Sequence, residues 1–202
     1  MPRKPKPTWE NVDDRNRPES DEMEIFMAAM RRLFGTTGAE GIVRAVGVSA
    51  RVTSTPVLSV GGAAATGDYV GTTTTPQAFE NVVRVAGGTG VIKSITITDK
   101  LTTAQVAMEL WLFSATFTAP TDNAAWSISD ADQLNCLGVI PIATDKWYAN
   151  AAGQVYSDDT LGLVIQPAVT SLFYALVARG TTPAWASGAG GSLQLSLGIL
   201  QD

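Results

Sequence analysis

Histidine is absent from the 202-residue sequence, and Cys136 is its only cysteine. Without histidine there is no Ser–His–Asp triad, no Cys–His pair and no histidine-bound metal. A single cysteine rules out an internal disulfide and a cysteine cluster for zinc or iron–sulfur. Because Cys136 adjoins the apolar run 137–142, we expect a buried structural thiol. The sequence therefore predicts no enzyme, no catalytic or metal-binding residue and no cofactor.

Charge is also scarce. Only 16% of the residues are charged, and the formal net charge is −5. An acidic chain lacks the basic surface that a phosphate backbone requires, which argues against nucleic acid as a direct partner. No apolar run approaches the ~18 residues of a membrane-spanning helix, so no membrane partner is expected. The N-terminal cations lack a following apolar segment, so no secretory signal is predicted.

The charges that are present gather at the N-terminus, where residues 1–34 hold 14 of the 33. The first 19 residues contain four prolines and no apolar periodicity, which excludes a helix or a central strand. Such a composition is typical of a disordered tail. The alternative, which we adopt as the prediction, is an extended arm that becomes ordered against a neighbouring molecule.

Residues 20–34 carry the clearest helical pattern. Ser20 can cap the helix, acidic residues follow in the first turn, and Arg31 and Arg32 lie near its end before Gly35. One apolar stripe is formed by Met23, Phe26, Met27, Met30, Leu33 and Phe34. This stripe packs either on the chain's own β body or on a partner, and the pattern leaves both open.

From residue 41 the apolar period changes to two, which predicts an all-β sandwich. We expect an arm and helix over 1–40, a β-rich connector with a Gly/Ala/Thr loop over 41–87, and a sandwich over 88–202. Strands are predicted at 42–54, 78–86, 90–99, 104–115, 137–142, 145–150, 161–166, 171–180 and 192–200. Two runs, 105–113 and 172–178, are apolar on both faces, as in central strands or strands that meet another subunit.

Few residues offer chemistry. Asp130 with Asp132 and Asp158 with Asp159 are candidate acid–base pairs, and Asp122 and Asn123 join them as hard oxygen ligands. Turn formation explains them better. Four aromatic residues in or near predicted loops could stack on sugars: Trp126, Trp147, Tyr148 and Trp185. Packing at the rim of the core is the preferred interpretation.

Several motifs over 88–202 together resemble a group of phage virion structural proteins. They are IKSITITDK (92–100), ELWLF (109–113), DNAAWSISDAD (122–132), LVARGTTPAW (176–185) and LGILQD (197–202). The resemblance implies a non-enzymatic capsid decoration or cement protein, and we expect its sandwich over 88–202 to be a jelly-roll-like antiparallel β-sandwich. It also implies a place on the phage head surface after synthesis in the bacterial host cytoplasm.

This resemblance implies two partners, the major capsid protein and further copies of the chain, with a trimer as the expected homo-oligomer. We expect the N-terminal cations to dock electrostatically and the apolar residues of the arm and helix to anchor the contact. The predicted partner-binding residues are Arg3, Lys4, Lys6, Trp9, Met23, Phe26, Met27, Met30 and Phe34. The alternative function is a tail or baseplate module that binds a receptor or glycan.

Overall fold

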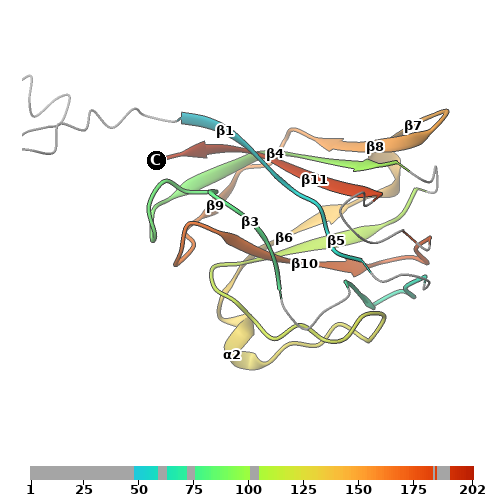
Figure 1. Ribbon diagram of the computed structural model, residues 1–202, viewed down its shortest axis with the longest axis horizontal. Helices are drawn as coiled ribbons and strands as arrows, with labels where there is room; N and C mark the ends of the chain where they lie inside the picture. Colours follow the sequence, from blue (N-terminus) through green and yellow to red (C-terminus); the bar gives the residue numbers. More distant parts are fainter. Residues whose placement is uncertain (1–47, 59–62, 72–75, 101–104, 184, 186–191) are drawn as a thin grey trace, which may run out of the picture. The chain divides into compact units, whose positions relative to one another are not determined.

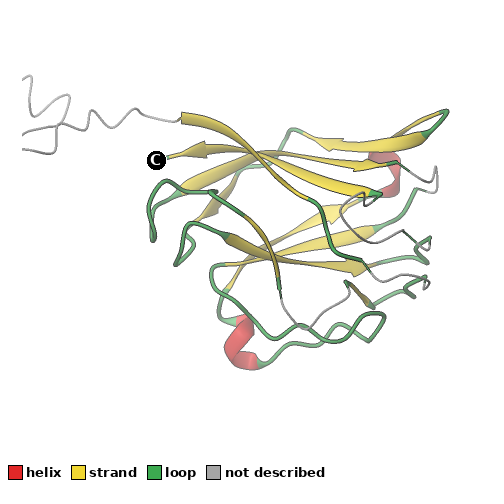
Figure 2. Ribbon diagram, in the orientation of Figure 1, coloured by secondary structure: helices red, strands yellow, loops and turns green. Residues whose placement is uncertain are grey.

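Antiparallel strands make up most of the secondary structure (Figures 1 and 2). The computed structural model describes residues 48–58, 63–71, 76–100, 105–183, 185 and 192–202. The predicted arm (1–19) and helix (20–34) lie outside these residues. Contacts group the described residues into one unit, Gly47–Asp202.

The first sheet, here called sheet 1, has the strand order β1–β11–β4–β8–β7. A short further strand, β9, pairs with the beginning of β4, while β8 pairs with its end. The bounds are β1 Val48–Ser54, β4 Gly90–Asp99, β7 Trp147–Asn150, β8 Gly153–Asp158, β9 Leu163–Ile165 and β11 Leu193–Gln201. Thus β8 and β9 occupy successive parts of the same side of β4.

The second sheet, sheet 2, has the order β2–β10–β5–β6. Its remaining strand, β3, pairs with β10 beyond β2, so β2 and β3 share one side of β10. The bounds are β2 Tyr69–Val70, β3 Gln77–Phe79, β5 Met108–Phe113, β6 Cys136–Ile142 and β10 Leu172–Ala178. Figure 1 shows the two sheets as separate layers.

One apolar core is drawn from both sheets. Alternate residues of β11 point inward from Leu193 to Ile199 and are at most 1% exposed, as the period of two predicts. Sheet 2 contributes Leu110, Leu112 and Leu176 to the same cluster. The predicted mainly β, sandwich-like fold is thereby confirmed.

Several local predictions need correction. Residues 80–86 form turns rather than the predicted continuation of a strand, although Val82 and Val83 are buried. The run 145–150 begins with the short 3₁₀ helix η3 (Thr144–Lys146) before β7. The predicted loop 61–76 contains β2, and β8 was not predicted. The α-helix of the described residues, α2 (Asp130–Gln133), is capped by Ser129.

The outer face of sheet 2 is covered by residues 114–129 of the same chain (Figure 1). Phe117, Trp126 and Ile128 from that segment pack against Phe113 and Phe173. Backbone hydrogen bonds fasten the segment, among them Tyr69 N to Ala124 O at 2.9 Å. The two-sided apolar character of β5 and β10 therefore reflects a second small core within the chain.

Candidate functional site

The predicted partner-binding residues of the arm and helix lie outside the described residues. These are Arg3, Lys4, Lys6, Trp9, Met23, Phe26, Met27, Met30 and Phe34. They remain predictions, and the candidate surfaces below come from the part of the chain that the structure describes.

Two of the four aromatic residues considered for sugar stacking belong to the core. Trp147 and Trp185 are each 4% exposed, and their indole N–H groups donate to Val106 O at 3.1 Å and to Asp99 Oδ2 at 2.9 Å. Trp126 belongs to the 114–129 segment and is half-buried, with its ring packed against that of Trp111. Tyr148, with 66% exposure, is the one of the four that is open to solvent. Packing, the preferred interpretation, therefore holds for the three tryptophans, two of them in the core itself, and does not hold for Tyr148.

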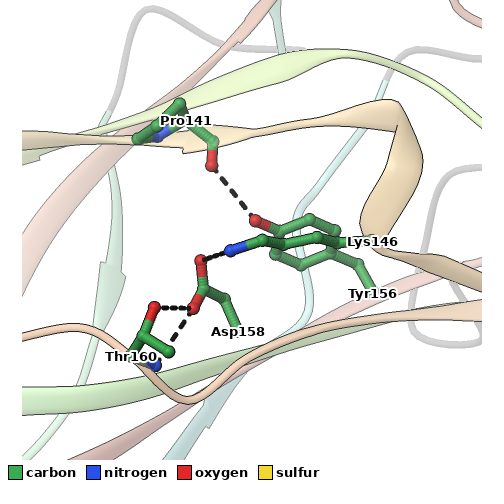
Figure 3. Close-up of polar contacts among 5 residues, drawn as sticks. All are labelled: Pro141, Lys146, Tyr156, Asp158 and Thr160. Carbon is green, nitrogen blue, oxygen red and sulfur yellow. Dashed lines mark hydrogen bonds and ion pairs between the residues drawn. The ribbon is translucent and has the colours of Figure 1, made fainter.

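A polar cluster links η3, β8 and the residues that lead to β9 (Figure 3). Lys146 Nζ forms an ion pair with Asp158 Oδ2, while Thr160 donates to Oδ1 from its amide at 3.0 Å and its hydroxyl at 2.7 Å. Tyr156 donates its hydroxyl to Pro141 O at 3.1 Å, which ties β8 of sheet 1 to β6 of sheet 2. Through this hydrogen bond the cluster connects the two sheets.

The surroundings of Asp158 favour its ionised form. The hydrogen bonds from Lys146 and Thr160 hold the pKa of Asp158 at about 2, below its usual 3.8. The same contact raises the pKa of Lys146. A general acid needs a pKa near the working pH, so Asp158 is unsuited to donate a proton near neutrality. The arrangement fits a structural clamp rather than the acid–base pair considered with Asp159.

This clamp predicts acid sensitivity. A carboxyl whose pKa is depressed on folding stabilises the fold above its unfolded pKa of 3.8, and this contribution disappears as the pH falls through about 2. We expect Asp158→Asn to remove about 1–2 kcal/mol near pH 6 and little at pH 2, after allowance for the solvent exposure of Lys146. Denaturant unfolding between pH 2 and 6 measures it. Exposed Asp159 provides the control, and an equal pH-dependent loss in Asp159→Asn would contradict the assignment.

The outer face of sheet 1, here defined as the outward positions of β1, β11, β4 and β8, presents mostly hydroxyl groups. Thr53, Ser196, Thr96 and Ser157 stand in register across the four strands. A second row consists of Arg51, Gly198 and Ser94. At the end that carries Leu200, an apolar row continues through Val91 to Val164, which is 64% exposed. Unlike the outer face of sheet 2, this face therefore reaches solvent at many positions.

Charge on this face has one sign. From residue 48 onward the chain has six basic and eleven acidic residues. The outward positions of the four strands carry Arg51 and Lys93 and none of the carboxylates. Neither cation forms an ion pair with a described residue, whereas Lys146 and Arg179 pair with Asp158 and Glu109. The outer face of sheet 1 is thus a candidate surface for an anionic partner.

Other candidates from the sequence are not brought together. Asp122 accepts a hydrogen bond from Gly71 N at 3.2 Å, which joins two segments distant in the sequence, and Asp132 accepts one from the hydroxyl of Ser129 at 2.8 Å, within the local turn that begins α2. Among described residues, no three metal-ligating Asp, Glu, Cys or His side chains gather. Cys136 is half-buried at the edge of the second small core. No helix of the described part is long and apolar enough to cross a membrane.

No family model matches the chain, and no curated protein matches it.

Sequence reasoning overlooked Arg51 and Lys93 as a pair. They are 42 positions apart in the sequence, and only the pairing of β1 and β4 with opposite sides of β11 brings them to one face. One signal was available, since Lys93 and Ser94 both lie between inward-pointing Ile92 and Ile95, which breaks the alternation of β4.

Proposed function

We propose that the chain is a non-enzymatic structural protein of a phage virion. In this proposal it is a decoration or cement protein that binds the major capsid protein and neighbouring copies on the outer surface of the head. The motifs over 88–202 that resemble virion structural proteins support it. The strand order of the two sheets is the structural observation that carries it.

We infer a jelly roll from that order. If β2 with β3, and β8 with β9, are each counted as one interrupted strand and the edge strand β7 is set aside, eight strands remain. When these eight strands are numbered along the chain, their spatial order is 1–8–3–6 in sheet 1 and 2–7–4–5 in sheet 2. Two nested Greek keys produce this order, and they occur in viral capsid proteins as well as in lectins and cupins.

A fold alone does not decide between those classes. The surface supports an assembly role, because the outer face of sheet 1 is broad and carries cations without carboxylates. Its edge strand β1 also follows directly in sequence on the segment that carries the predicted arm and helix. Many weak contacts from repeated copies add up to firm attachment to a shell, and we propose a homo-oligomer, with a trimer as the expected form.

Co-sedimentation with phage heads that lack this protein tests the proposal. We expect the full chain to sediment with the heads, and the triple variant Arg3→Ser, Lys4→Ser, Lys6→Ser to require at least about tenfold more protein for half-occupancy, since each cation contributes to docking. The double variant Arg84→Ser, Lys100→Ser, which removes exposed cations elsewhere, should bind as the parent does.

Two results would contradict parts of this proposal. If the full chain does not sediment with heads, the head assignment is wrong, and the tail or glycan-binding function takes its place. If the triple variant binds as well as the parent, the arm is not the docking element, and the described β unit holds the shell.

A further inference from the structure

An irregularity in β4 shapes a groove on the outer face of sheet 1. Pairing with β11 shifts register between Gly198 and Ile199, which pair with Ser94 and Ile92 and leave Lys93 as an extra residue. As a result Lys93 is exposed and Ser94 half-buried between the fully buried Ile92 and Ile95. Such bulges re-aim side chains and are frequent beside functional sites.

Gly198 makes room for the groove. It lies between Arg51 of β1 and Ser94 of β4 in the cross-strand row, and a Cβ at residue 198 would overlap Ser94 Oγ. The groove has a volume of about 260 Å³. Its lining residues are Ser49, Ala50, Arg51, Ser94, Thr96, Ser196 and Gly198. Because Gly198 has no side chain, backbone atoms form the floor of the groove, while hydroxyl groups and the guanidinium of Arg51 form its walls.

The donors around this groove are matched to an oxyanion. The guanidinium of Arg51 has five N–H donors. Among the described residues, it donates one hydrogen bond, to Ser196 Oγ at 3.2 Å. Four hydroxyl groups line the same space, and the exposed Lys93 directly precedes the lining residue Ser94 in the bulge. Among the residues that the structure describes, no carboxylate lines the groove. Guanidinium and ammonium groups bind carboxylate and phosphate through short, charge-assisted hydrogen bonds.

We propose that this groove binds a small oxyanion, a phosphate or carboxylate group, between Arg51 and Ser94 with Lys93 at its side. A cation is disfavoured by two positive side chains without a carboxylate. A neutral sugar would leave the guanidinium unmatched and has no aromatic ring to stack on among the lining residues. The size of the groove suits one such group and its immediate substituents rather than an extended chain. The site is independent of whether the chain binds a phage head.

Amide chemical shifts of the full-length protein, titrated with inorganic phosphate and separately with acetate at constant ionic strength, test the site. We expect saturable shifts that centre on β1, on the bulge of β4 and on Gly198. Arg51→Gln should weaken binding of the preferred anion at least about tenfold, and Arg51→Lys less, because it keeps the charge but loses the planar fork. Lys93→Gln should weaken it about threefold. The stronger of the two anions identifies phosphate or carboxylate as the natural group.

Arg84→Gln is the matched control. Arg84 is an exposed arginine that does not line the groove, and it forms no ion pair with a described residue. Thermal unfolding of each variant shows that the fold is intact. The proposal is overturned if neither anion gives saturable shifts, if the shifts lie elsewhere, or if Arg84→Gln weakens binding as much as Arg51→Gln does. A Ser94→Ala variant adds a second readout, because it removes a lining hydroxyl group without changing the charge. The proposal is also overturned if both Ser94→Ala and Arg51→Gln bind the anion as tightly as the parent does.

Discussion

Replacing Trp147 by alanine is expected to lower the free energy of unfolding by about 3–5 kcal/mol, the usual cost of deleting a buried indole. The ring is 4% exposed, lies 5.5 Å from the ring of Tyr156 between centroids, and donates to Val106 O. Alanine leaves a cavity beside Tyr156 and removes the donor of a buried carbonyl. Denaturant unfolding, followed by circular dichroism, measures the loss.

The neighbouring residue provides the control for this experiment. Tyr148 is 66% exposed, so Tyr148→Ala should change stability by no more than about 0.5 kcal/mol. A small effect of Trp147→Ala would show that the indole is not part of the core. The comparison also bears on sugar binding, because a loss of glycan binding in Trp147→Ala would reflect unfolding, whereas a loss in Tyr148→Ala would reflect the surface.

The strands that sequence reasoning predicted share one property, an inward face made of apolar side chains. Apart from the extra residue at Lys93, apolar residues alternate through 90–99 and 192–200, and β4 matches its predicted range while β11 differs by a single residue at each end. The pattern needs no tertiary information, because each strand has one face toward the core and one toward solvent.

The missed strand β8 has a different inward face. Gln154, Tyr156 and Asp158 point inward and are buried, while Val155 and Ser157 point outward, so polarity does not alternate in the usual sense. Its inward carboxylate is tolerated because Lys146 of η3 and Thr160, two positions after Asp158, supply its partners. Neither partner lies in β8, so this compensation leaves no periodic signal in the strand.

The candidate site was hidden for a similar reason. Serine, threonine and glycine on an outward strand face are common in any sheet, and apart from the broken alternation at Lys93 and Ser94 nothing in a single strand points to the groove. The groove arises from the order β1–β11–β4, which places residues from three distant parts of the chain side by side. By contrast, the two apolar faces of 105–113 correctly indicated a central strand and left open whether the outer face was covered by the chain or by a partner.

A cavity in the second small core is expected to loosen the 114–129 segment. Phe117 is 4% exposed, and its ring lies 4.2 Å from that of Phe113 and 6.0 Å from that of Trp126, edge-on to the latter. Phe117→Ala should cost about 3 kcal/mol and accelerate amide hydrogen exchange in 114–129 more than in β4 or β11. Hydrogen exchange followed by mass spectrometry measures both regions in one experiment.

The outcome decides what role the segment has. Leu134→Ala is the control, because Leu134 is 88% exposed and lies in the same connection between β5 and β6, so its exchange should match the parent. Uniform acceleration in Phe117→Ala would show that the small core unfolds only together with the main one. Selective acceleration would show a separable cover, and the freed Trp111 and Phe173 would then add apolar surface to sheet 2. Sedimentation velocity should in that case detect new self-association, because exposed aromatic strands pair readily with one another.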